Sequence, residues 1–313
     1  MTVLVAGAAG FIGSHLCDQL LAEGFEVVGM DNLSTGRRSN VSEALDHEAF
    51  RFVEHDVTMS LPDVGRVDQI YHLASPASPS DFATMPLEIL DVGSNGTRNL
   101  LRLAERWGAR LLLASTSEVY GDPLEHPQRE TYWGNVDPIG PRSCYDEAKR
   151  FAEALTTAYR MHRGVDTVIV RIFNTYGPRM RPGDGRVLIN FISQAIRDEP
   201  VTVYGDGSQT RSFCYVDDEV RGIIAAMSSG QPGPFNIGNP NEISIRHVAE
   251  SVVRAVASTS EVVCAPLPPE RRGDPSRRRP DIDLARRLLN WSPTIELEDG
   301  LRSMIADVRE SMR

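Results

Sequence analysis

Tyr145 and Lys149 lie four residues apart, about one helical turn, so on a helix both side chains leave the same face. A phenol has a pKa near ~10 and keeps its proton at neutral pH, but a neighbouring cation favours the phenolate and lowers that pKa. The pair can then act as a base towards an alcohol, which can also lose a hydride to a nearby acceptor. Most pairs with this spacing are only a packed tyrosine and an exposed lysine. The elements around the pair must therefore decide between the two interpretations.

The start of the chain predicts a dinucleotide-binding unit. Residues 3–6 have the pattern of a short buried strand, and the glycine-rich turn 7–13 follows it. Helical periodicity runs over 11–23, and a second apolar strand over 25–30 ends at Asp31. Strand, glycine turn, helix, strand and acid in this order are typical of a βαβ unit that binds a dinucleotide. The glycines let the backbone approach a pyrophosphate, and the helix N-terminus offers free N–H groups.

Asp31 is predicted to select the cofactor. Its carboxylate can accept hydrogen bonds from both ribose hydroxyls and would repel a 2′-phosphate, so NAD is expected rather than NADP. Arg37 and Arg38 follow closely and keep NADP open as the alternative, because a guanidinium can bind that phosphate.

Strands and helices continue to alternate through the next part of the chain. Strands are expected at residues 50–54, 69–74, 110–114 and 167–173, and helices at 86–107 and 145–162. This alternation predicts an α/β fold, a Rossmann-type doubly wound parallel sheet with right-handed crossovers. Active residues of such folds lie at the carboxyl ends of strands, where Thr116, Glu118 and Asn174 are found.

The pattern loosens after residue 173, and a smaller C-terminal α+β portion is predicted. Helices are expected at 187–197, after the cap Ser244, and around 301–308. We therefore predict an NAD-binding domain over 1–173 and a smaller domain over 174–313 that covers the strand ends. Residues near 213–238 are expected to return to the first domain.

Composition and charge exclude several classes of partner. The 313 residues carry a net charge of −10, which argues against nucleic acid or an anionic membrane, so an anionic substrate needs a local basic pocket. No basic leader or membrane-spanning apolar run is recognised, and a cytoplasmic location is expected. The cysteines are widely spaced, which is consistent with a reducing compartment and predicts no metal cluster. They are Cys17, Cys144, Cys214 and Cys264.

With these motifs together, the chain resembles the extended short-chain dehydrogenase/reductase family, whose members act on nucleotide sugars. The resemblance covers nearly the full length and includes Ser115-Thr116-Ser117 beside the tyrosine–lysine pair. Its most specific parts are the Ala-Ser-Pro-Ala-Ser-Pro loop at 74–79 and the Pro-Ile-Gly-Pro-Arg approach at 138–142. Within the family, the chain looks most like the members that decarboxylate UDP-glucuronate.

The resemblance implies a redox-neutral conversion of UDP-glucuronate to UDP-xylose with NAD as cofactor. Tyr145 takes the proton of the sugar 4-hydroxyl while C4 gives hydride to NAD. The resulting 4-ketone makes the C5 carboxylate a β-keto acid, so carbon dioxide leaves and its electrons are held as an enolate. C5 then gains a proton and hydride returns to C4. The smaller domain is expected to bind the nucleotide sugar.

The resemblance also implies residue roles. Thr116 joins the proton chain at the sugar hydroxyl, Glu118 orients substrate for decarboxylation, and Arg278 holds the anionic substrate. The cofactor is expected to contact Gly7, Gly10, Phe11, Ile12, Gly13, Asp31, Asn32, Asp56, Val57, Leu73, Ala74, Tyr145 and Lys149. The nucleotide sugar is expected to contact Asn174, Arg186, Tyr204, Gln209, Arg211 and Arg278. A solvated face is expected for the other arginines of the basic run, which are Arg271, Arg272, Arg277 and Arg279.

Ser117 separates this chain from related dehydratases. Those enzymes carry Thr-Asp-Glu at this strand end, and the aspartate protonates a departing hydroxyl. Serine is a far weaker acid, so water elimination is disfavoured here. A nucleotide-sugar 4-epimerase or 4,6-dehydratase remains the alternative enzyme, and carbon dioxide release distinguishes them. A non-catalytic NAD-binding sensor is the alternative from another class, although such proteins commonly lose the tyrosine or the lysine.

Two further expectations concern helices. The family usually has asparagine where this chain has Gly93, so the resemblance leaves the local geometry of the long helix after Pro86 undetermined. A homodimer is expected to form when that helix and the Tyr145 helix pack into a four-helix bundle. Ordinary packing within one subunit is the alternative. The apolar residues at the helical spacing that suits such a contact are Phe151, Leu155, Ala158 and Tyr159.

Overall fold

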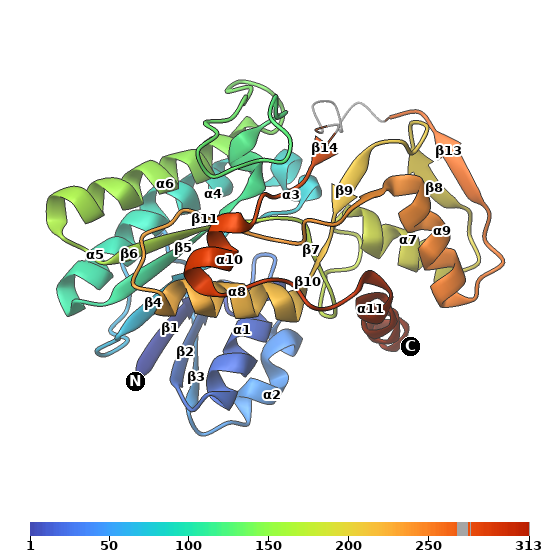
Figure 1. Cartoon of the computed structure of the whole chain (residues 1–313). Coiled ribbons are helices and arrows are strands. Elements are labelled where there is room, and N and C mark those ends of the chain that lie inside the picture. The colour runs from blue at the N-terminus through green and yellow to red at the C-terminus, as the bar shows by residue number, and fades with distance from the viewer. Residues whose placement is uncertain (268–274, 276, 313) are drawn as a thin grey trace.

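The computed structural model describes residues 1–267, 275 and 277–312, so Arg271 and Arg272 lie outside the described residues. Seven strands of the described part form one parallel sheet in the order β11-β6-β5-β4-β1-β2-β3 (Figure 1). The chain runs outward from β1 to β3 and then crosses to β4 on the other side, which creates a switch point beside β1. The predicted doubly wound α/β fold is confirmed. The strands of this sheet are β1 (Thr2–Ala6), β2 (Glu26–Asp31), β3 (Phe50–Glu54), β4 (Gln69–His72), β5 (Arg110–Thr116), β6 (Thr167–Ile172) and β11 (Phe235–Ile237).

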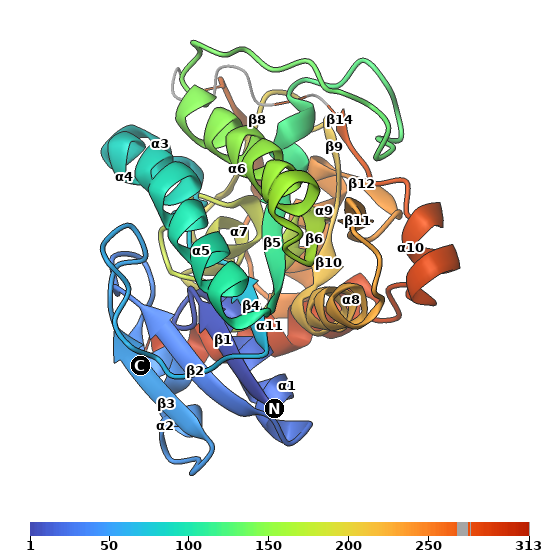
Figure 2. The same cartoon turned by 90° about the vertical axis from the view of Figure 1, so that its left-hand side faces the viewer.

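Helices cover both faces of the sheet. Helices α1 (Phe11–Ala22) and α8 (Val216–Ser228) lie on one face, and α5 (Thr97–Trp107) and α6 (Ser143–Arg163) lie on the other (Figure 2). Shorter helices complete these layers, namely α2 (Ser42–Leu45), α3 (Pro79–Thr84), α4 (Pro86–Asp91) and α10 (Asp283–Leu289). Single 3₁₀ turns occur at Arg38–Val41 and Ser117–Tyr120.

Successive residues of β1 show why the sheet needs cover on both faces. Val3 and Val5 belong to the core that contains residues of α1, whereas Leu4 and Ala6 belong to the core that contains residues of α5. All four are fully buried. Side chains alternate between the faces of a strand, so a strand buried on both sides must be apolar throughout. Each buried side chain the size of valine or leucine contributes about 1.5–3 kcal/mol to this arrangement.

The later part of the chain builds smaller layers beside the carboxyl ends of the sheet. Helix α7 (Val187–Ile196) packs against α9 (Ile245–Val256), and β8 (Val201–Tyr204) pairs with β13 (Val262–Ala265). The predicted cap of α9 is confirmed, because Ser244 Oγ accepts a hydrogen bond from His247 N at 3.3 Å. The remaining elements are β7 (Thr175–Tyr176), β9 (Thr210–Ser212), β10 (Cys214–Tyr215), β12 (Glu242–Ser244), β14 (Arg277–Arg278) and α11 (Leu297–Ser311).

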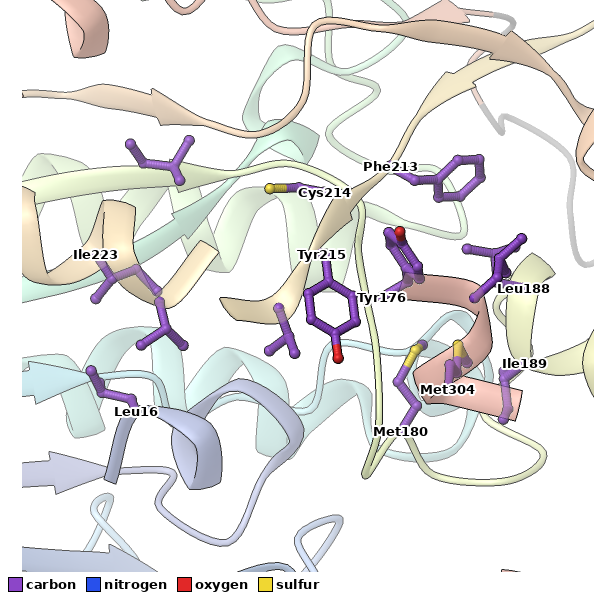
Figure 3. Packing of buried hydrophobic residues seen from close by; sticks show 14 of the residues in the cluster. Leu16, Tyr176, Met180, Leu188, Ile189, Phe213, Cys214, Tyr215, Ile223 and Met304 are labelled. Atoms are coloured by element: carbon purple, nitrogen blue, oxygen red, sulfur yellow. The ribbon is translucent and has the colours of Figure 1, made fainter. Parts of the chain in front are cut away.

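A continuous apolar core joins these layers to the sheet. Figure 3 shows Tyr176, Met180 and Tyr215 between Leu16 of α1 and Met304 of α11, and all five residues belong to one buried cluster. Two late segments also pack with the sheet, since β11 pairs with β6 and α8 contacts α1. The carboxyl ends of the strands are therefore held firmly against the later part of the chain.

The long helix predicted at 86–107 is divided. Helices α4 and α5 are joined by a π-helical turn, Val92–Gly96. Within it, Gly93 lies against α6, and a Cβ at this position would be 2.7 Å from Ala148 Cβ and 2.8 Å from Ala148 O. Carbon atoms prefer separations of about 3.5–4.0 Å, so only glycine permits this approach. The contact occurs on the turn of α6 that also carries Lys149.

Gly93→Ala is expected to destabilise the protein by about 1–3 kcal/mol, the usual cost of overpacking, because the new methyl group would meet backbone as well as side chain. Urea unfolding followed by circular dichroism measures the change. Asn95→Ala in the same π-helical turn is the control, because Asn95 is exposed and its replacement should stay within about 0.5 kcal/mol of the parent. Equal unfolding midpoints for Gly93→Ala and the parent would contradict the close packing.

Candidate active site

A cavity of about 830 Å³ opens at the carboxyl ends of the parallel strands. Many of the predicted site residues line it together, although they come from distant parts of the chain. They are Gly7, Gly10, Phe11, Ile12, Gly13, Leu73, Thr116, Glu118, Tyr145, Lys149, Asn174, Arg186, Tyr204, Gln209, Arg211 and Arg278. The predicted residues that do not line it are Asp31, Asn32, Asp56, Val57 and Ala74.

The glycine turn forms the wall of the cavity at the switch point of the sheet. A Cβ at Gly13 would be 2.0 Å from Gly7 O, so this close turn requires glycine. Helix α1 begins within this turn, at Phe11, and no side chain caps its N-terminus. Its first N–H groups and the positive end of its dipole are therefore available to an anion in the cavity. This cradle fits the pyrophosphate of a dinucleotide.

Asp31 ends β2 below this cradle. Its Oδ2 accepts a hydrogen bond from Ala9 N at 2.9 Å, and its Oδ1 accepts one from Leu33 N at 2.8 Å. Burial raises the pKa of Asp31, although these backbone donors favour its ionised form. The carboxylate is thus fixed in position by the turn it supports. Asn32 and Asp56 lie farther out, joined by a hydrogen bond of 2.9 Å.

This side of the cavity is also lined by three residues that were not predicted as cofactor contacts, namely Thr35, Arg37 and Asn40. The Nη2 atom of Arg37 donates to Arg179 O at 3.2 Å, so this guanidinium ties the cofactor side to the loop after β7. Asn40 Nδ2 donates to Ala9 O at 2.9 Å. In the sequence, Arg37 was interpreted only as a candidate ligand for the 2′-phosphate of NADP. No local pattern indicated its contact with a distant loop.

Tyr145 and Lys149 project from α6 beneath the end of β5. Lys149 Nζ lies 5.8 Å from the centre of the Tyr145 ring and donates to Ala114 O at 2.8 Å. Phe82 stacks on the Tyr145 ring, with ring centroids 4.9 Å apart. Burial lowers the pKa of Lys149 to about 8, which makes its proton more readily exchangeable.

The tyrosine–lysine spacing predicted that the cation lowers the pKa of the tyrosine, and this prediction is wrong for the protein alone. Burial raises the pKa of Tyr145 to about 12 and outweighs a hydrogen bond with Thr116 and the charge of Arg186. Desolvation disfavours a phenolate more than these partners favour it. A further positive charge beside the ring would favour the phenolate and lower this pKa.

Glu118 is held between two arginines. Its Oε2 accepts hydrogen bonds from Arg142 Nη2 at 2.7 Å and from Arg278 Nη2 at 3.0 Å. Burial favours the neutral acid, but the charges of Arg278 and Arg142 hold the pKa of Glu118 at about 2. Arg278 is 1% exposed and also donates to Ser117 O. Arg278 is therefore buried, in contrast to the exposed Arg277 before it.

The contact between Arg142 and Glu118 was missed in the sequence, where Arg142 appeared only as the last residue of a motif. Its position before α6 gave no sign that its side chain would reach the end of β5. The strand β14 brings Arg278 to the same carboxylate by pairing with β9, where Arg278 lies opposite Arg211. Three segments thus meet at one ion-pair cluster, which we call the Glu118 clamp: Glu118, Arg142 and Arg278.

The remaining predicted substrate residues lie around the far half of the cavity. Asn174 Nδ2 is buried and has no hydrogen-bond acceptor among the described residues, so a ligand can supply one. Arg186 Nη2 donates to Ala77 O at 3.0 Å, which joins the loop before α7 to the loop after β4. Gln209 Nε2 donates to Tyr204 O at 2.7 Å.

Two negative findings apply to the described part of the chain. It contains no group of three or more His, Cys, Asp or Glu side chains arranged to hold a metal ion. None of its helices combines the length and apolar character needed to cross a bilayer.

The fold and the cavity together define a class of protein. A glycine turn at the switch point of a parallel sheet, with a buried tyrosine–lysine pair across the same cavity, is the site of a dinucleotide-dependent short-chain dehydrogenase/reductase. The family described as GDP-mannose 4,6 dehydratase matches residues 4–304, and the chain belongs to this family. The resemblance to extended short-chain dehydrogenase/reductases is thereby confirmed.

Individual relatives narrow the comparison. UDP-glucuronic acid decarboxylase 1 of Arabidopsis thaliana is 52% identical over 309 residues, which are 99% of this chain and 70% of the relative. The solved UDP-glucose 4-epimerase of Thermotoga maritima with UDP-glucose has a TM-score of 0.91 and 29% identity, with 100% of both chains covered. The UDP-glucuronic acid 4-epimerase of Bacillus cereus in complex with UDP-glucuronic acid and NAD has a TM-score of 0.87 and 30% identity, and the match covers 99% of this chain and 100% of that chain.

Proposed function

We propose that this protein is an NAD-dependent carboxy-lyase that converts UDP-glucuronate to UDP-xylose and carbon dioxide through a 4-keto intermediate. The relatives named UDP-glucuronic acid decarboxylase support this activity at 50–52% identity over nearly the whole chain. The observation that carries the proposal is the Glu118 clamp. It brings two arginines to the strand end beside Tyr145, where an anionic sugar must bind, and it holds the Glu118 carboxylate of that strand end in its ionised form.

The cofactor site fits NAD. The uncapped N-terminus of α1 and the close turn at Gly13 accommodate a pyrophosphate, and Asp31 disfavours an additional phosphate on the ribose. Bound NAD supplies a hydride acceptor and the positive charge that the buried Tyr145 lacks. Asp31 is positioned to support the turn through two backbone N–H groups, so its replacement would affect both the turn and the ribose.

Tyr145 is the group that moves the proton of the sugar 4-hydroxyl. Thr116 is its hydrogen-bond partner, and Lys149 lies beside the ring with a lowered pKa, so the three form a chain from the hydroxyl into the protein. The same Tyr145 oxygen returns the proton to O4 when the ketone is reduced again. The reaction is redox-neutral because the hydride removed from C4 also returns there, while Tyr145 supplies the matching proton.

The clamp explains why carbon dioxide rather than water is lost. Elimination of a hydroxyl needs an acid in direct contact with it, but Glu118 is ionised throughout the neutral range and Ser117 is no acid at that pH. Decarboxylation of a β-keto acid needs only a held carboxylate and a place for its electrons. Arg278 Nε is buried without an acceptor among the described residues, so this arginine has a donor to offer to an anion.

A UDP-glucuronate 4-epimerase is the second candidate, because solved epimerases of this kind share the fold at about the same TM-score as other neighbours. The two reactions begin with the same oxidation at C4. They differ in whether C5 keeps its carboxylate. A sensor without turnover is less well supported, since both Tyr145 and Lys149 are present and buried in one cavity.

The proposal also covers the domain boundaries, the cellular compartment and the oligomeric state. We assign residues 1–173 to the NAD-binding domain, with returns near 213–238, and 174–313 to the nucleotide-sugar-binding domain. A cytoplasmic location is supported by four cysteines that are all free. A homodimer is supported by exposed apolar side chains on neighbouring helices, which are Leu87 and Leu90 of α4 and Phe151 of α6.

The activity is tested by incubating the protein with UDP-glucuronate and NAD and measuring carbon dioxide and the sugar product. We expect one carbon dioxide for each UDP-xylose formed. Tyr145→Phe should lose both oxidation and decarboxylation, because the proton acceptor is gone, while circular dichroism stays unchanged. UDP-galacturonate without carbon dioxide would instead identify an epimerase, and binding of NAD without any product would identify a sensor.

Arg278→Ala is expected to reduce kcat/KM for UDP-glucuronate by about tenfold to hundredfold, the effect of losing ~1.5–3 kcal/mol from one charge-assisted contact. It should raise KM and slow carbon dioxide release. Arg277→Ala is the matched control, because Arg277 is exposed on the same short strand and should leave activity unchanged. Carbon dioxide release at the parent rate by folded Arg278→Ala would show that the buried arginine serves structure alone.

The homodimer is tested by light scattering at micromolar concentration. Of the four residues with helical spacing on α6, Leu155 and Tyr159 pack partly against the core, whereas Phe151 is 45% exposed. Phe151→Asp is therefore expected to produce monomers, because it places a charge in the contact. Leu288→Asp on α10 is the control, with the same 45% exposure. A monomer in the parent protein would refute the assembly.

A further inference from the structure

A second, smaller cavity lies behind the Glu118 clamp. Its volume is about 230 Å³, several times the ~30 Å³ that one water molecule occupies in the liquid. Side chains of the segment between β5 and α6 line it, including Asp122, Asn135 and Asp137, and Asp146 reaches it from α6. The residues common to the walls of both cavities are Glu118, Arg142 and Pro275. The side cavity therefore meets the active site at the clamp.

Asp146 is the unusual group in this side cavity. It follows Tyr145 on α6 and is 5% exposed. Its Oδ1 atom is buried and has no hydrogen-bond partner in the part of the chain that the structure describes. A buried polar atom without a partner is unfavourable and uncommon, so it calls for a water molecule or a proton. The side cavity provides the room for water beside it.

The surroundings of Asp146 raise the pKa of its carboxyl to near neutral pH. Burial raises its pKa to about 7, and the negative charge of Glu118 acts in the same direction. The opposing charges are Arg142 and Arg278, and Glu147 contributes a further increase. The other titratable neighbours, Tyr145 and Cys144, have pKa values raised by burial and stay neutral. Asp146 can thus both release and regain a proton at physiological pH, which the ionised Glu118 cannot.

Decarboxylation consumes a proton, which such a group can supply. When carbon dioxide leaves, the enolate carbon C5 must gain one proton, and the overall reaction takes one proton from solvent for each carbon dioxide released. Tyr145 cannot be its final source, because the proton that it removes from the 4-hydroxyl has to return to O4. Glu118 cannot supply it either, because its pKa is held at about 2. The proton therefore has to enter from outside the known catalytic groups.

We infer that Asp146 and the side cavity deliver this solvent proton to the active site, an inference that rests on the proposed function. The O–H bond of the Asp146 carboxyl breaks as its proton passes to water at the clamp, and water passes a proton on to C5, where the new C–H bond forms. The Asp146 carboxylate then takes a proton from water in the side cavity. No electrons are exchanged with Asp146. It acts through water and is a relay residue, without contact to the sugar.

Asp146→Asn tests this inference, because asparagine keeps the shape and neutrality of the protonated acid but cannot release the proton. UDP-xylose formation should slow by at least about tenfold, with KM for UDP-glucuronate changed by less than about twofold. The share of turnovers that end in released 4-keto sugar should rise, because the enolate waits longer for its proton. The parent should also lose activity as pH rises through about 7, where Asp146 deprotonates, and Asp146→Asn should lack this decline.

Glu147→Gln is the matched control, because this neighbouring carboxyl lies on the same helix turn, is half-exposed and faces Arg150. It should retain the parent rate and product ratio, and its decline at high pH should remain but begin at slightly lower pH, because Glu147 helps to raise the pKa of Asp146. If Asp146→Asn keeps the parent pH profile and releases no additional 4-keto sugar, the relay is refuted while decarboxylation stands. If the parent releases no carbon dioxide at all, the proposed function itself fails, and the relay with it.

The parent enzyme alone gives a second test that does not depend on the variant folding. In D₂O, the rate of UDP-xylose formation above pH 7 should fall more than the rate of the first oxidation, because only the later step takes a solvent proton. The xylose should carry one deuterium at C5. Equal solvent isotope effects on both steps at high pH, with no decline in activity between pH 7 and 9, would overturn the relay.

Discussion

The Glu118 clamp is the interaction on which the site depends. A carboxylate at the end of β5 is buried where an isolated charge would be very costly, so it requires partners. Arg142 reaches it from the start of α6, and Arg278 reaches it from β14. This requirement ties the start of the helix that carries Tyr145 and Lys149 to the end of β5. It also places the strand β14 beside β9, next to Arg211.

Local patterns were sufficient to predict the first six strands of the sheet and the glycine turn at the start of α1. The alternation of residues along β1, the glycine turn and Asp31 each express a constraint that acts over a few neighbours, and the structure agrees with the predicted elements. The division of the long helix by a π-helical turn could not be predicted, because it depends on the contact of Gly93 with Ala148 across two helices. The sequence shows that a glycine is there, but not what it touches.

The site was predicted less completely, for the same reason. The residue pattern alone does not distinguish Arg278 from the other arginines of the basic run; the family resemblance singled it out, and the tertiary fold shows it buried beside the exposed Arg277. Arg142 and the stacking of Phe82 on Tyr145 were missed, since both depend on loops whose paths have no periodic signal. The effect of burial on the pKa of Tyr145 was also missed, because desolvation depends on everything packed around the ring.

The place of Arg278 in the chain has a consequence for protein synthesis. The last strand of the large sheet, β11, ends at Ile237, so a ribosome completes the sheet and the tyrosine–lysine helix well before it adds Arg278. Until then, Glu118 can pair with Arg142 but not with Arg278, so its charge is less well compensated. The strands of the large sheet and helix α6 are therefore synthesised first, and the arginine that holds the anion is added late. An incomplete chain would carry the residues that oxidise a sugar without the residue that secures its carboxylate.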